Sequence, residues 1–160
     1  MDTTTLSRQA TLLGVITGMR SMTGLATISA YLNHGAPQEL GAPWDRLGSP
    51  TADAVSKVAA LGEMIADKTP AIPARIKPGP LVGRALIGAL GGGSFAQSRG
   101  ESALTGAGFG ALGAIASTFG FYYLRQQIDN RLHMPDFVVA LAEDAAAVTL
   151  ALRWLQDAEQ

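Results

Sequence analysis

The fold is decided by residues 11–31, TLLGVITGMRSMTGLATISAY, the first long apolar segment, which carries Arg20 at its centre. An arginine at the centre of a bilayer costs at least roughly 2.5–3.5 kcal/mol. The cost is tolerable only where the guanidinium faces a bundle interior, a watery cavity or a carboxylate. The stretch therefore predicts a compact helical membrane protein with a charged interior. The carboxylates available to Arg20 are Glu63, Asp67, Glu143 and Asp144.

The composition favours a membrane protein over a soluble one. The chain has 160 residues, enough for four to five membrane-length helices of about 20 residues in one domain. Charged residues make up 16%, below the roughly 25% of soluble domains, and 19 residues are glycine. Glycine and alanine keep the mean hydropathy only slightly positive, so a soluble helical bundle stays open as the alternative.

Several function classes are excluded by composition and spacing. A net charge of −1 gives no basis for nucleic-acid binding, and the absence of cysteine excludes thiol chemistry. His34 and His133 have no companions at ligand spacing, so we expect no metal. The dinucleotide-like glycines of residues 108–113 follow no strand, so we expect no nucleotide cofactor. No catalytic triad is evident, so an enzyme is the less favoured class.

Apolar segments separated by proline and glycine predict five helices. Residues 33–50 contain too many prolines and glycines for a continuous helix and form an extramembrane loop. Residues 70–80, PAIPARIKPGP, form an extended basic connector whose Arg75 and Lys77 can contact lipid headgroups. The helices are expected at about 7–32, 51–68, 80–97, 101–130 and 135–157.

If all five segments span, the distribution of Lys and Arg weakly favours a cytoplasmic N-terminus and an outside C-terminus in a multi-pass protein of the cell (inner) membrane. Whether residues 51–68 span is left open. Aromatic side chains are expected at the membrane interfaces, namely Tyr31, Trp44, Tyr122, Tyr123 and Trp154.

Weak similarity between two parts of the sequence suggests an inverted repeat, as in some transporters. The sequence ALGE at 60–63 resembles ALAE at 140–143. The pair Gly14 and Gly18 likewise resembles Gly106 and Gly110, and chance matches remain the alternative in so alanine-rich a chain.

Glu63 and Asp67 are four residues apart, so they share a helix face and repel each other. Glu143 and Asp144 reach the depth of Arg20 if the last helix spans. Four deep acids exceed two deep arginines, Arg20 and Arg84, by two, and Arg84 is close enough to its helix start to snorkel. The excess favours a bound proton or cation, unless Asp67 and Lys68 lie at headgroup level. Supporting polar residues are Thr17, Thr23, Lys68 and Arg84.

Glycines at four-residue spacing predict close helix packing, within the chain or in a homo-oligomer. They are Gly14, Gly18, Gly83, Gly88, Gly92, Gly106, Gly110, Gly113 and Gly120.

These residues together resemble the bacterial integral-membrane family called domain of unknown function 4126. The resemblance rests on residues 18–24 (GMRSMTG), 62–68 (GEMIADK) and 81–84 (LVGR), with Pro70, Pro73, Arg75, Pro135, Asp136, Glu143 and Asp144. It implies a small multi-helix membrane protein and brings no biochemical activity or catalytic residues with it.

Three functions remain in order of preference. The first is a proton- or ion-coupled transporter or channel for an unknown small solute or ion, with Arg20, Glu63, Asp67, Glu143 and Asp144 lining its pathway. The second is a structural or assembly protein whose buried charges hold the helices in register and whose glycine faces bind partner helices. The third is a lipid-modifying membrane enzyme.

Overall fold

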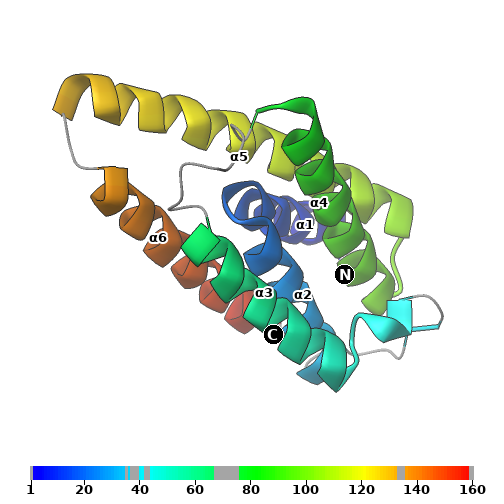
Figure 1. Cartoon of the computed structure of the whole chain (residues 1–160). Helices are drawn as coiled ribbons and strands as arrows, with labels where there is room; N and C mark the ends of the chain where they lie inside the picture. Colours follow the sequence, from blue (N-terminus) through cyan, green and yellow to red (C-terminus); the bar gives the residue numbers. More distant parts are fainter. Residues whose placement is uncertain are drawn as a thin grey trace.

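The computed structural model describes residues 2–34, 36, 40–41, 44–66, 76–132 and 136–158. Within these residues the chain is all-helical and has no strands (Figure 1), which confirms the all-α prediction. The elements in chain order are α1 (Thr3–Met19), α2 (Ser21–His34), the short 3-10 helix η1 (Trp44–Arg46), α3 (Pro50–Ala66), α4 (Pro78–Ser98), α5 (Ala103–Leu132) and α6 (Asp136–Ala158).

The first predicted helix is in fact a hairpin of two helices, α1 and α2, which meet at Arg20. Arg20 has an extended backbone, with φ −142° and ψ 108°, and ends α1. The two helices fold back on each other. Gly24 of α2 lies so close to Thr17 of α1 that a Cβ would overlap it, and Leu13 and Ile28 both lie against Gly91 of α4. The prediction of one continuous helix over residues 7–32 is therefore wrong. No proline marks the break, so local sequence hides it.

The other helix boundaries lie within about three residues of those predicted. α4 begins at Pro78 instead of Pro80, because Pro78 suits a first helical turn and Lys77 takes the N-cap position. Asp67, Lys68, Pro70, Pro73, Arg75, His133 and Pro135 lie outside the described residues.

Glycine contacts join α4 and α1 to α5. Gly88 and Gly92 face Gly110 and Gly106, so closely that a Cβ on any of the four would overlap the opposing helix. Gly14, Gly18 and Gly113 are used in the same way between α1 and α5. Seven of the nine predicted packing glycines therefore pack within the chain. The other two, Gly83 and Gly120, face open space.

An aromatic cluster forms the centre of the apolar core. Tyr31, Phe95 and Trp154 lie with ring centroids 5.2–5.5 Å apart. The Trp154 Nε1–H donates to the Gln9 carbonyl at 2.8 Å. That Tyr31 and Trp154 lie at the depth of a membrane interface stays a prediction. They are 0% and 2% exposed, so they do not face the outside of the bundle. Their rings instead join α2, α4 and α6.

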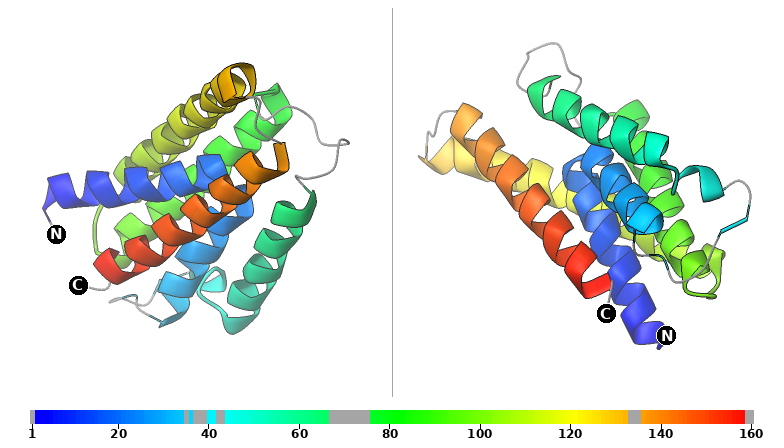
Figure 2. Two further views of the ribbon diagram at one scale, coloured as in Figure 1. Left: turned by 90° about the vertical axis from the view of Figure 1, so that its left-hand side faces the viewer. Right: turned by 90° about the horizontal axis from the view of Figure 1, so that it is seen from below.

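The helices are arranged so that both termini lie at one end of the molecule. Arg8 of α1 and Asp157 of α6 form an ion pair at 3.6 Å, and the N and C labels are near each other in both views of Figure 2. The predicted N-inside, C-outside arrangement assumed five spans, and the α1–α2 hairpin removes one of them. In the left view of Figure 2, α1 lies between α5 and α6.

Of the described residues, one helix segment is long and apolar enough to cross a membrane, Ala103–Ile128 of α5. The sequence predicts four to five such spans, more than the described residues provide by this criterion. α1 and α2 have 17 and 14 residues, so they are about 26 and 21 Å long, short of the roughly 30 Å hydrocarbon core.

Candidate functional site

The tip of the α1–α2 hairpin carries a buried arginine. The Arg20 side chain is 0% exposed, and its Nη2 lies 2.7 Å from Oδ1 of Asp144 on α6. The sequence predicts that Arg20 meets one or more of four acidic residues, and the described part of the chain brings Asp144 to it. Because a carboxylate and a guanidinium attract strongly where water is scarce, this pair joins the hairpin tip to α6.

The break at Arg20 leaves the first amide groups of α2 free to bind a side chain. The N–H groups of Ser21 and Met22 donate to the two carboxylate oxygens of Glu63, at 3.0 and 2.8 Å. A carboxylate is favourable at a helix N-terminus, where the backbone N–H groups and the helix dipole both attract it. Glu63 therefore ties α3 to the hairpin tip.

Arg84 of α4 approaches the same point. Its Nε donates to Ser21 Oγ at 3.1 Å, and its Nη2 lies 4.0 Å from Glu63 Oε1. The side chain is 5% exposed. The expectation that Arg84 snorkels toward the membrane surface is therefore wrong, because it turns inward to a carboxylate and a hydroxyl.

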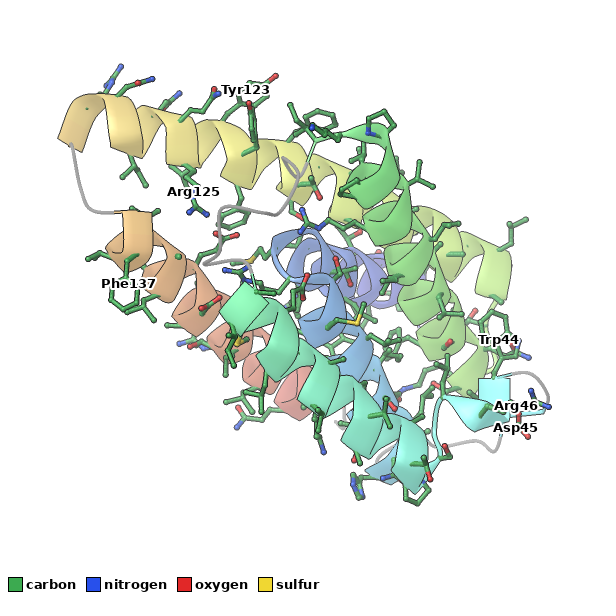
Figure 3. The ribbon with its side chains drawn as sticks, viewed as in Figure 1. Trp44, Asp45, Arg46, Tyr123, Arg125 and Phe137 are labelled. Atoms are coloured by element: carbon green, nitrogen blue, oxygen red, sulfur yellow. The ribbon has the colours of Figure 1, made fainter. Side chains whose placement is uncertain are left out.

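A third arginine belongs to the site. Arg125 of α5 lies 3.7 Å from Glu143 of α6, with side-chain exposures of 24% and 7%. Figure 3 shows Arg125 directed from α5 toward α6, whereas Tyr123 points away from the bundle. The sequence analysis missed Arg125. The unexplained excess of carboxylates is the signal that a further arginine was needed.

These six residues form what we call the charge network: Arg20, Glu63, Arg84, Arg125, Glu143 and Asp144. Three guanidinium groups balance three carboxylates among the described residues. The predicted excess of two carboxylates is therefore absent there, and Asp67 lies outside the described part of the chain. The described network consequently needs no added cation, and a proton entering it would change the balance of charge.

The predicted supporting residues have different surroundings. Thr17 is buried and donates its hydroxyl to the Leu13 carbonyl at 2.9 Å. Thr23 is 5% exposed, and no hydrogen bond to its Oγ1 is found in the described part of the chain. Lys77 is exposed at the start of α4.

A second polar cluster fastens the opposite ends of α2 and α3. Asp53 accepts hydrogen bonds from Lys57 at 2.8 Å and Asn33 at 3.4 Å, and His34 lies 3.6 Å away. Burial alone would raise the pKa of Asp53, but the hydrogen bond and charge of Lys57, with help from Asn33 and His34, hold this pKa below its ordinary value. The cluster was not predicted.

Two hollows lie on either side of α6. A cavity of about 170 Å³ between α5 and α6 is lined by apolar side chains and by Arg125 and Glu143. A larger groove of about 330 Å³ lies between α2, α3 and α6. We call it the α2–α3–α6 groove, and its lining includes Thr23, Ala26, Ala60, Met64, Val148 and Leu152.

The described residues contain no group of three or more His, Cys, Asp or Glu side chains placed to hold a metal ion. The chain matches no protein-family model, no curated protein and no solved structure. The resemblance to domain of unknown function 4126 therefore stays a prediction.

Proposed function

We propose that this chain is a small integral membrane protein whose charge network forms the polar site of a proton- or ion-coupled transporter or channel. The observation that carries the membrane part is the distribution of side chains. Large apolar side chains are exposed on α3, α4, α5 and α6, whereas arginine, threonine and serine side chains are buried. Soluble proteins rarely expose so much contiguous apolar surface, and a bilayer would cover it.

The exposed side chains follow helical stripes. On α3, Val55, Val58, Leu61 and Ile65 are each more than 60% exposed, at spacings of three and four residues. On α6, Phe137, Leu141, Val148 and Leu152 are 40–59% exposed, at spacings of four and seven residues. A stripe of this kind is a lipid-facing surface when the opposite face of the helix is packed.

The α1–α2 hairpin supports the transport part. Both of its helices are too short to cross a bilayer, so we place it as a re-entrant element, with α5 and α6 crossing as an antiparallel pair. Non-helical backbone at membrane depth is tolerated where it is buried in protein. Discontinuous helices whose ends face the bound solute or ion are common at the binding sites of transporters.

Glu143 is the carboxylate best placed to take up a proton. It borders the 170 Å³ cavity, and its partner Arg125 is the most exposed of the three arginines. Protonation removes its attraction for Arg125 and loosens α6 from α5. Asp144 is the next residue on α6, so the change is transmitted directly to Arg20.

The balanced ion pairs also favour the second candidate, a structural or assembly protein. In that case the charge network only holds five helices in register. Oligomer contacts would then use Gly83 and Gly120 and the exposed apolar stripes, because the other seven packing glycines are occupied within the chain.

The first test is location and flux. We expect the expressed protein in the inner-membrane fraction, resistant to alkaline carbonate extraction. Purified protein in liposomes is then screened for proton-linked or ion flux with a pH-sensitive dye and ion-selective electrodes. Glu143→Gln keeps the side-chain size and should reduce flux at least tenfold while the protein remains folded.

Asp157→Asn is the matched control on the same helix, because Asp157 is 48% exposed and lies outside the network. It should leave flux unchanged. If no flux appears in any condition and Glu143→Gln lowers only the stability, the assembly function replaces the transporter.

A further inference from the structure

The α2–α3–α6 groove ends beside the charge network. Thr23 follows Ser21 and Met22, whose amides bind Glu63, and Met64 is next to Glu63 in α3. Val148 lies one helical turn after Asp144 on α6. Both views of Figure 2 show α3 and α6 on either side of α2. The inner end of the groove is therefore adjacent to the network.

The groove has the chemical character of a binding site for an apolar chain. Its volume of about 330 Å³ falls within the range of about 300–1,000 Å³ typical of small-molecule pockets. Most of its walls are alanine, leucine, valine and methionine side chains. Such sites bind mainly through apolar contact and use a few polar groups to orient the ligand.

One polar group of this kind is present at the inner end. Thr23 is 95% buried, lines the groove, and its Oγ1 has no hydrogen-bond partner within the described residues. By contrast, Thr27 in the same groove donates to the Thr23 carbonyl at 2.7 Å. A buried hydroxyl without a partner is unfavourable unless a ligand supplies one. It therefore points to an oxygen atom in the bound molecule.

The length of the groove sets the length of the ligand. Thr23 and Ala30 both line it and are seven residues apart on α2, or about 10 Å along the helix. An extended chain covers that distance with about nine atoms, since three backbone atoms advance roughly 3.5 Å.

We propose that the α2–α3–α6 groove binds a single-chain amphiphile of about ten carbons or more, with an uncharged oxygen head, a hydroxyl or a protonated carboxyl, hydrogen-bonded to Thr23. An uncharged head suits the neighbouring network, in whose described residues three positive groups balance three negative groups. The hydrocarbon chain of the ligand lies along α2 and leaves the groove near Lys57. The inference deepens the proposed function by naming an amphiphile as the solute, and so rests on it.

The test is photo-crosslinking of the full chain as purified, from whichever fraction holds it, with a diazirine-bearing ten-carbon alcohol. We expect labels on the α2, α3 and α6 peptides that line the groove. Unlabelled 1-decanol and decanoic acid at acidic pH should compete better than decane, because decane offers no partner to Thr23. If the acid competes and the alcohol does not, the head is a carboxyl; the reverse result assigns a hydroxyl.

Two variants test separately the binding of the ligand's hydrocarbon chain and the binding of its oxygen head. Ala26→Phe fills the groove and should reduce labelling at least tenfold, with Ala30→Leu as the substitute if Ala26→Phe does not fold. Thr23→Val keeps the shape and should weaken competition by 1-decanol about fivefold, the loss of one hydrogen bond, with no change for decane. Val82→Phe, on an exposed face of α4, is the control and should change nothing.

Labels spread evenly over the exposed faces of α3, α4 and α5, or competition no better than that of decane by both 1-decanol and decanoic acid, would overturn the proposal. The assay measures binding without flux, so its outcome is independent of the transport test. Binding without flux removes the transporter and keeps the groove. Flux that survives Ala26→Phe, with no labelling of the groove, keeps the transporter and removes this ligand.

Discussion

At the scale of single residues, Arg20 determines most of the architecture. Its guanidinium is wholly buried against Asp144 at 2.7 Å, and its extended backbone ends α1. The break exposes the amides that Glu63 binds, and Ser21 at the start of α2 receives Arg84. One charged residue thus brings α3, α4 and α6 to a common point.

The Arg20–Asp144 pair can be tested by a double-mutant cycle. Asp144→Leu leaves the buried guanidinium without the Asp144 carboxylate, and Arg20→Met leaves that carboxylate without the Arg20 guanidinium. Each single variant should lower the free energy of unfolding by about 3–5 kcal/mol, the usual cost of breaking a buried pair. The double variant should lose much less than the sum, because no charge of the pair remains buried.

Denaturant unfolding followed by circular dichroism, in detergent where the protein requires it, supplies the free energies. Strictly additive losses would mean that the two side chains are not coupled.

At the scale of helices, glycine positions decide which faces pack. Gly110 of α5 lies against Gly88 of α4, whereas Gly108, two residues earlier on the same helix, has no atom near its missing Cβ. The dinucleotide-like glycines of residues 108–113 therefore lie within the continuous helix α5. Gly108 faces open space, whereas Gly110 and Gly113 contact neighbouring helices.

These two glycines form a matched pair for mutation. Gly110→Ala places a methyl group against the backbone of α4 and should destabilise the protein by about 1–3 kcal/mol. Gly108→Ala meets open space and should stabilise it by about 0.5–1 kcal/mol, because alanine favours the helix interior. Thermal unfolding of both variants is the measurement, and equal shifts of the same sign would contradict the packing of α4 on α5.

At the scale of the whole molecule, α1 runs alongside α5 while α6 runs back toward the N-terminus. Gly14 and Gly113 lie in the contact between α1 and α5. The ion pair of Arg8 with Asp157 joins α1 to the end of α6. The two chain ends therefore share one end of the bundle. The C-terminal end of α5 lies at the other.

This arrangement predicts the membrane topology. The chain has no cysteine, so single cysteines can be introduced at exposed positions without background. Thr5→Cys and Gln156→Cys should react with a membrane-impermeant maleimide from one side, which we expect to be the cytoplasm. Asn130→Cys, near the end of α5, should react from the opposite side. Labelling of all three from one side of sealed vesicles would contradict the crossings of α5 and α6.

The two halves of the inverted repeat suggested by sequence differ in the described helices. The first half breaks at Arg20 soon after Gly18, whereas α5 continues without a break for 30 residues, well past Gly110. Glu63 binds a helix N-terminus, and its counterpart Glu143 pairs with Arg125. The matching letters therefore occupy different structural positions.

The all-helical class, most helix boundaries and the need of Arg20 for an acidic partner follow from the sequence alone, because they depend on local periodicity, proline positions and the cost of burying a charge. Only the tertiary structure decided that residues 11–31 fold into a hairpin, that Asp144 is the partner, and that Arg84 and Arg125 turn inward. Each of these depends on contacts between helices far apart in the chain. Neither proline nor hydrophobic pattern records a break that is held by a carboxylate more than 40 residues away.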